Sequence, residues 1–159
     1  MFYQREMEVA LEACLAAGEA VMPYFNGARY HVREKSQGNP VTSADLEANR
    51  KIKEVILQAF QEDCWLSEEE ADSPLRLGKS RVWIIDPIDG TKEFIEKVPE
   101  FSLSVGFVVD GEPEAAVVFN PATKEMFKAV RGGGTFVNER RVYVSTRQNL
   151  EGSTTLASR

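Results

Sequence analysis

Apolar residues recur at helical spacing in two segments of the N-terminal part of the chain. The first stripe predicts one long amphipathic helix over about residues 4–25, which Asn26 and Gly27 would end as a C-cap does. This stripe contains Met7, Ala10, Leu11, Cys14, Leu15, Gly18, Val21, Met22 and Phe25. The second stripe predicts a helix that begins at Thr42 or Ser43, where Thr42 and Asp45 form a capping-box-like start. This stripe contains Leu46, Ile52, Val55, Ile56, Ala59 and Phe60.

The pattern changes from helical to strand-like from Cys64 onward. Residues 102–109 alternate like a half-buried strand, and Asp110 with Gly111 is a strong hairpin signal. Further strands are predicted over residues 115–119, 126–130, 136–137 and 142–144, with turns at residues 120–123 and 132–134. This antiparallel meander predicts an α+β fold, in which two long, antiparallel neighbouring helices pack on one face of a mostly antiparallel sheet.

Two polar or glycine-rich segments are predicted as connections. Residues 29–40 are polar, and residues 35–40, with the sequence KSQGNP, indicate a mobile loop. The triple glycine at residues 132–134 invites interpretation as a phosphate-binding loop. No helix follows it, so the helix N-terminus of such a site is missing and a hairpin turn is the better prediction.

Length, composition and charge exclude several classes of protein. The 159 residues suit one well-packed domain and are short for two, with 43% hydrophobic and 28% charged residues. A net charge of −6 argues against a broad nucleic-acid-binding surface, so a nucleic acid polymer is not an expected partner. No apolar run approaches the roughly 20 residues that span a bilayer, so no membrane span is expected.

The cysteines and the histidine carry no chemistry in this sequence. Cys14 and Cys64 are too few for a disulfide framework and lie in apolar patterns, so both are predicted as core residues of a cytoplasmic protein. His31 is the single histidine, lies in a polar stretch and is expected to be incidental.

The most informative stretch is residues 83–91, with the sequence WIIDPIDGT. A hydrophobic strand ends in Asp86 and Asp89, and Pro87 between them stops the ladder of hydrogen bonds. Gly90 permits a tight turn, and Thr91 offers a hydroxyl beside both acids. Two carboxylates held in this way suit a hard divalent cation such as Mg²⁺. Taken alone, two aspartates at this spacing are more often simple turn residues.

The longer motif resembles the signature W-[IV]-[IL]-D-P-[IL]-D-G-T of the inositol monophosphatase family of Mg²⁺-dependent, Li⁺-sensitive phosphatases. Two further segments resemble family motifs in the expected order, namely LSEE at residues 66–69 and PVTSAD at residues 40–45. Three ordered motifs are far more specific than one. The resemblance implies the N-terminal half of the layered sugar-phosphatase-type fold.

The resemblance also implies a set of metal ligands. These would be the carboxylates of Glu68, Asp86 and Asp89 and the backbone carbonyl of Ile88. Glu69 would act on the metal through a water molecule. Two or three Mg²⁺ ions are the implied cofactors, and Li⁺ is an implied inhibitor. Without the resemblance, residues 68–70 would be interpreted as a solvated acidic turn.

Other residues receive catalytic or phosphate-binding roles from the same resemblance. The Thr91 hydroxyl would orient the nucleophilic water, and Asp45 would accept its proton or align it. Asp45 is equally a first-turn acid favoured by the helix dipole. The phosphate would lie near the N–H groups of Gly90 and Thr91, with Lys35 and Lys92 close by.

The expected substrate is a small-molecule phosphate monoester. The sequence TKEFI at residues 91–95 resembles the 3′(2′),5′-bisphosphate nucleotidase branch, which acts on 3′-phosphoadenosine 5′-phosphate, whereas inositol phosphatases more often carry TNF there. Inositol-1-monophosphatase, or another sugar-phosphate phosphatase, is the alternative. A haloacid-dehalogenase phosphatase is disfavoured because its nucleophilic aspartate lies two residues from its partner, not three.

The family places a second α/β domain after this strand region, with one more aspartate ligand in a W-D segment. Neither Trp65 nor Trp83 precedes an aspartate. Residues 1–159 are therefore expected to form an N-terminal metal-binding domain without the C-terminal domain. Its uncovered interface predicts self-association or a homodimer. A catalytically inactive metal-binding or oligomerising fragment is the alternative that is not an enzyme.

Overall fold

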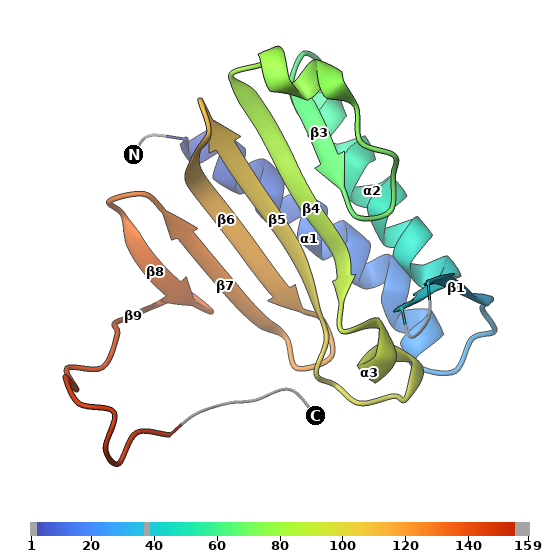
Figure 1. Cartoon of the computed structure of the whole chain (residues 1–159). Coiled ribbons are helices and arrows are strands. Elements are labelled where there is room, and N and C mark those ends of the chain that lie inside the picture. Colours follow the sequence, from blue (N-terminus) through green and yellow to red (C-terminus); the bar gives the residue numbers. More distant parts are fainter. Residues whose placement is uncertain (1–2, 37–38, 155–159) are drawn as a thin grey trace.

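The structure is a computed structural model that describes residues 3–36 and 39–154. Helices α1 (Gln4–Phe25) and α2 (Ser43–Ala59) lie on one face of a seven-stranded sheet, as Figure 1 shows. The two helices are neighbours, and α2 returns in the direction opposite to α1. No helix in the described ranges is long and apolar enough to cross a bilayer.

The sheet follows the order of its strands along the chain. Its members are β3 (Cys64–Ser67), β4 (Arg81–Asp89), β5 (Ser102–Val109), β6 (Glu112–Asn120), β7 (Glu125–Val130), β8 (Gly134–Val137) and β9 (Arg140–Val142). Strands β3 and β4 are parallel, and every other neighbouring pair is antiparallel. The predicted α+β fold with a mostly antiparallel sheet is therefore confirmed.

Helix α2 begins where its sequence predicts. The Thr42 side chain accepts hydrogen bonds from the N–H groups of Ala44 and Asp45, and the Asp45 carboxylate accepts one from the Thr42 N–H. This reciprocal capping satisfies donors that the first turn of a helix leaves free. It also fixes Asp45, a buried acid, at the end of α2 that lies nearest to α3 (Thr91–Ile95).

Three details of the sequence prediction were wrong. The predicted loop contains a small antiparallel hairpin of β1 (Val32–Ser36) and β2 (Asn39–Thr42), and residues 37 and 38 lie outside the described part. All five β1 residues are exposed and apolar residues do not recur at alternate positions, so no alternation revealed the strand. Leu15 and Leu46 of the predicted stripes are about half exposed. The last strand ends at Val142, since Tyr143 and Val144 are exposed beyond it.

Strand β4 is held at its start by contacts with other elements. At its start, Arg81 forms a two-pronged ion pair with Asp63 at 2.7 and 2.9 Å and a further pair with Glu6 at 3.0 Å. The indole N–H of Trp83 donates to Asp63 at 2.9 Å, and the Trp83 ring packs on Phe107 with 4.7 Å between centroids. These contacts fix the strand that carries the candidate site at its other end.

Candidate metal and phosphate site

An extra residue near the end of β4 brings Asp86 and Asp89 to one face of the sheet. Asp86 pairs with Ser104 of β5, and Asp89 pairs with Ser102, so two residues of β4 lie between these pairs where β5 has only one. Side chains three positions apart would point to opposite faces of a regular strand. The irregularity at Pro87 and Ile88 removes this offset, as a β-bulge does. The proline thus helps to place both carboxylates on one side.

Strand β3 carries Glu68 to the same edge. It runs parallel to β4 with Ser67 opposite Ile85, and the Glu68 N–H donates to the Ile85 carbonyl at 3.3 Å. Parallel strands end on the same edge of a sheet, so Glu68 follows β3 beside the end of β4. The predicted metal ligands therefore come from two neighbouring strands.

These residues surround a cavity of about 260 Å³. Its lining is formed by Pro40, Glu68, Asp86, Ile88, Asp89, Gly90, Thr91, Lys92 and Glu93. The structure thus brings the predicted metal ligands and the predicted phosphate-binding residues of β4 and α3 into one place. Asp45 and Lys35 form hydrogen bonds with members of this group, and Glu69 is joined to it through Lys35.

Asp86 shows the electrostatic character of the cavity. Its burial, together with the charges of Glu68, Asp89 and Glu69, raises its pKa from the ordinary 3.8 to about 7. Its Oδ1 atom is buried without a hydrogen-bond partner. Among the described residues, Trp65 Nε1 is the one other buried side-chain atom without a partner. An unpartnered carboxylate oxygen among other acids fits a divalent cation, which prefers oxygen ligands.

A lysine from the β1–β2 hairpin supplies positive charge to this group. The Lys35 ammonium lies 3.1 Å from Glu68 Oε1 and 2.5 Å from Glu69 Oε1. Burial raises the pKa of Glu69 above its ordinary value, and the bonds from Lys35 act against that rise. As they stand, no three His, Cys, Asp or Glu side chains within residues 3–36 and 39–154 are gathered closely enough to hold a metal ion.

The Thr91 hydroxyl lies between two acceptors at the start of α3. Its Oγ1 atom is 3.1 Å from Asp45 Oδ1 and 3.1 Å from the Ile88 carbonyl. The other oxygen of Asp45 accepts from the Thr42 hydroxyl at 2.6 Å and from the Thr42 N–H at 2.7 Å. Burial raises the pKa of Asp45, and these hydrogen bonds oppose the rise. The arrangement can orient a molecule bound to Thr91 Oγ1, whose lone pairs remain available.

Gly90 makes the turn into α3 sterically allowed. Its φ is +87°, and a Cβ atom there would lie 2.9 Å from the Glu100 carbonyl oxygen. Both conditions favour glycine. The aromatic side chains of Phe94 and Phe101, with ring centroids 5.0 Å apart, pack below this turn and hold α3 in place.

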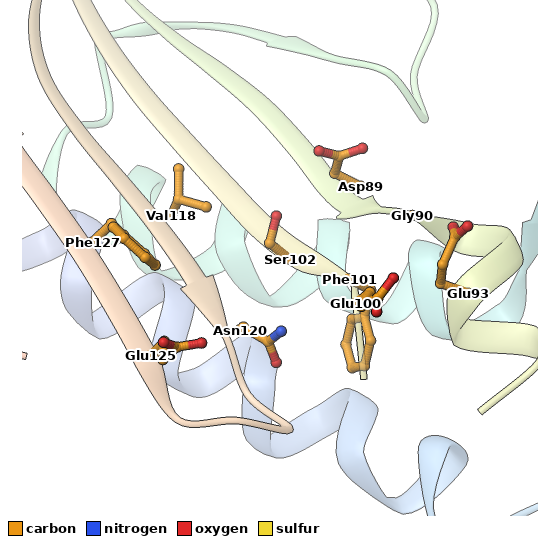
Figure 2. Close-up of a pocket in the computed structure, with 10 residues that line it drawn as sticks. All are labelled: Asp89, Gly90, Glu93, Glu100, Phe101, Ser102, Val118, Asn120, Glu125 and Phe127. Carbon is orange, nitrogen blue, oxygen red and sulfur yellow. The ribbon is translucent and has the colours of Figure 1, made fainter. Parts of the chain in front are cut away.

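A second hollow lies on the sheet face opposite the helices. Figure 2 shows its lining, which includes Asp89, Ser102, Val118 and Phe127 from β4 to β7, and its volume is about 460 Å³. It shares Asp89 and Gly90 with the smaller cavity. The candidate site therefore opens onto a sheet face that no described helix covers.

Sequence reasoning missed two buried polar residues beside the site, Asn49 and Ser67. The signal for Asn49 was present, because it occupies an inward position of α2 four residues after Asp45 and three before Ile52. Ser67 lies within the LSEE segment of residues 66–69, but nothing in that segment indicated that its hydroxyl pairs with Asn49. The predicted incidental residue His31 lies exposed beside the β1–β2 hairpin, outside the cavity lining.

Residues 3–159 match the inositol monophosphatase family. The chain belongs to this family. It is 38% identical to the inositol-1-monophosphatase of Rhizobium meliloti (strain 1021), over 91% of this chain and 54% of that protein. It is 37% identical to the histidinol-phosphatase of Chlorobaculum parvum, over 88% of this chain and 53% of that protein.

Solved structures of the inositol monophosphatase family share this fold. The extragenic suppressor protein SuhB from Bartonella henselae superposes with a TM-score of 0.87 at 30% identity, over 92% of this chain and 57% of that one. The family and fold predicted from the sequence are thus confirmed. The chain spans about half the length of the curated relatives it matches.

Proposed function

We propose that this chain supplies the metal-binding side of the active site of a Mg²⁺-dependent phosphomonoesterase. The observation that carries the proposal is the extra residue in β4, which turns Asp86 and Asp89 to one face beside Glu68. The unpartnered Asp86 Oδ1 and the raised pKa of that carboxyl support it, because a cation would relieve both. Membership of a family whose named relatives include two phosphatases agrees with it.

The proposed roles follow from these positions. Glu68, Asp86, Asp89 and the Ile88 carbonyl would hold two or three Mg²⁺ ions, with Glu69 acting through water. Such ions lower the pKa of bound water and stabilise the leaving oxygen of a phosphate ester.

The chain's own acid–base groups lie at Thr91. Its hydroxyl donates toward Asp45, so its lone pairs can accept a hydrogen bond from the attacking water and align it. Asp45 would take up the proton. The N–H groups of Gly90 and Thr91, with Lys35 and Lys92, would bind the phosphate oxygens.

The finer proposal is a 3′(2′),5′-bisphosphate nucleotidase that acts on 3′-phosphoadenosine 5′-phosphate. Lys92 supports it, because this exposed cation lines the cavity next to Thr91 and could meet a second phosphate. Inositol 1-phosphate is the second candidate substrate, favoured by the name of one relative.

A complete active site would also need residues that face the metal-binding side from across the cavity. Exposed apolar side chains lie on β4, β6 and β7 of the uncovered face, namely Ile84 at 43%, Val118 at 37% and Phe127 at 41%. We propose that a further domain of a longer protein covers this face and completes the site. The 159-residue chain by itself would then turn over substrate poorly or not at all, and would self-associate through the same face.

The test is a phosphate-release assay on the 159-residue chain and on the product of its full reading frame. Both receive 3′-phosphoadenosine 5′-phosphate and inositol 1-phosphate with Mg²⁺, and then with added Li⁺. We expect turnover that requires Mg²⁺ and is inhibited by Li⁺ in the longer protein only, with a preference for the bisphosphate. A preference for inositol 1-phosphate would overturn the proposal that 3′-phosphoadenosine 5′-phosphate is the substrate. Efficient turnover by the 159-residue chain alone would overturn the proposal that a further domain completes the site.

A further inference from the structure

A buried chain of hydrogen bonds joins helix α2 to the segment that carries Glu68 and Glu69. Asn49 of α2 is 6% exposed and Ser67 of β3 is 5% exposed. The Ser67 hydroxyl donates to Asn49 Oδ1 at 2.5 Å, and Asn49 Nδ2 donates to Glu70 Oε1 at 2.7 Å. Buried polar groups are costly unless they are paired, so these partners hold one another in a single arrangement.

The chemistry of the partners fixes the orientation of the Asn49 amide. The Glu70 carboxylate can only accept, so the NH₂ group must face it and the amide oxygen must face Ser67. The second oxygen of Glu70 accepts from the Lys53 ammonium at 2.5 Å. Both carboxylate oxygens of Glu70 therefore bind side chains of α2. Glu68 and Glu69 differ from Glu70 in that their carboxylates bind Lys35.

The same network reaches the backbone of the candidate metal ligands. The Ser67 hydroxyl accepts from the Glu69 N–H at 3.2 Å, and the Ser67 carbonyl accepts from the Glu70 N–H at 3.4 Å. On the other side, the Glu68 N–H donates to the Ile85 carbonyl of β4. The segment that carries Glu68 and Glu69 is thus tied to β4 at one end and to α2 at the other.

Nothing else in the described contacts explains a buried asparagine on the inward face of α2. The described part of the chain buries four polar or charged residues, Thr42, Asp45, Asn49 and Ser67. Thr42 and Asp45 belong to the hydrogen-bonded group around Thr91. Asn49 and Ser67 form the second group, and both groups contact the candidate site from α2 or its cap.

We propose that Asn49, acting through Ser67 and Glu70, is a positioning residue that orients Glu68 and Glu69 toward the metal-binding cavity. This inference rests on the proposed function, because it concerns the same acidic group. Residues that orient metal ligands typically change metal affinity by about 10–100-fold when they are replaced. Asn49 and Glu70 lie outside the three motifs that define the site in the sequence, whereas Ser67 lies within one of them.

The experiment measures Mn²⁺ affinity of the 159-residue chain from the electron paramagnetic resonance signal of free Mn²⁺. The test variants are Asn49→Leu, which removes both hydrogen bonds of the side-chain amide, and Ser67→Ala, which deletes the hydroxyl oxygen. Hydrogen exchange at the amides of residues 68–70 is measured in parallel. All binding is measured well below each variant's thermal midpoint, so that only folded protein is compared.

Two control variants, and a third variant at the outer end of the network, separate positioning from general stability. Asp63→Asn weakens the contacts with Arg81 and Trp83 at the opposite end of β4, so it lowers stability without touching residues 67–70. Arg50→Met removes the exposed ion pairs with Glu47 and Glu54 on α2. Lys53→Met removes the outer contact with Glu70. We expect Asp63→Asn and Arg50→Met to bind Mn²⁺ like the wild type, and Lys53→Met to lose no more than about five-fold.

We expect Asn49→Leu and Ser67→Ala to weaken Mn²⁺ binding by about 10–100-fold and to speed exchange at residues 68–70. The double variant should bind Mn²⁺ with about the same affinity as the single variant that binds it less tightly, because both substitutions break the same network. Wild-type affinity in Ser67→Ala, or an equal loss in Asp63→Asn, would overturn the positioning role. Absence of wild-type Mn²⁺ binding, or binding unchanged by Asp86→Asn, would instead overturn the proposed function and this inference with it.

Discussion

The sharpest stability prediction concerns Asp86 in the metal-free protein. The folded protein raises the pKa of this carboxyl from 3.8 to about 7, so the folded state binds its proton more tightly than the unfolded chain does. The resulting contribution to stability is complete below the unfolded pKa and is lost as the pH rises through about 7. Asp86→Asn mimics the neutral acid and cannot ionise. It should therefore stabilise the metal-free protein at alkaline pH.

The size of this effect follows from the shift and the exposure of the side chain. A rise of about three pKa units corresponds to at most about 4 kcal/mol, since one unit is about 1.4 kcal/mol. Asp86 is only half-buried, so solvent screening reduces the expected difference to about 1–2 kcal/mol. The variant and the wild type should be equally stable near the unfolded pKa and should diverge by that amount at about pH 8.

Urea unfolding in the presence of a chelator, measured across this pH range, gives the free energies directly. Asp110→Asn is the matched control, because it makes the same substitution in the exposed turn between β5 and β6, remote from the acidic group. Saturating Mg²⁺ should then stabilise the wild type and leave Asp86→Asn nearly unchanged, since a ligand stabilises only the protein that binds it.

The reasoning is refuted if Asp86→Asn is no more stable than the wild type at alkaline pH in chelator. It is also refuted if Asp110→Asn gains as much, because the gain would then come from net charge and not from the cavity.

Three further substitutions test other parts of the site. Thr91→Ala in the longer protein should lower kcat by about 10²-fold with unchanged metal affinity by calorimetry, whereas a loss of affinity would make Thr91 only a turn residue. Gly90→Ala should destabilise the chain by about 1–3 kcal/mol in urea unfolding, because φ is positive and the new Cβ would crowd the Glu100 carbonyl. Asp63→Asn should cost about 1–3 kcal/mol by the same measurement, since it weakens the contacts with Arg81 and Trp83; a neutral result would deny them a structural role.

Local patterns predicted most of the fold. The start of α2 could be foreseen because Thr42 and Asp45 cap it within four residues of sequence, and the structure shows both bonds. Strands β5 and β6 alternate, and short turns separate the strands from β5 to β8, so their order needed no long-range information. The β1–β2 hairpin escaped prediction because no β1 residue is buried, so β1 lacks the alternation of apolar and polar positions that marks a half-buried strand.

The candidate site could be predicted only in part. The order of residues indicated that Asp86 and Asp89 converge, but the cause is a register irregularity that only the pairing with β5 reveals. The contacts of Lys35 with Glu68 and Glu69 join residues more than thirty positions apart, so no local pattern encodes them. The ligand roles of these residues remain predictions.

We propose above that a divalent cation binds at the shared edge of β3 and β4. Crystals of the 159-residue chain soaked in Mn²⁺ would test it most directly, through an anomalous difference map. We predict anomalous density bounded by Glu68, Asp86 and Asp89, absent from crystals of Asp86→Asn. Mn²⁺ bound elsewhere on the protein, with no density at this edge, would contradict the account.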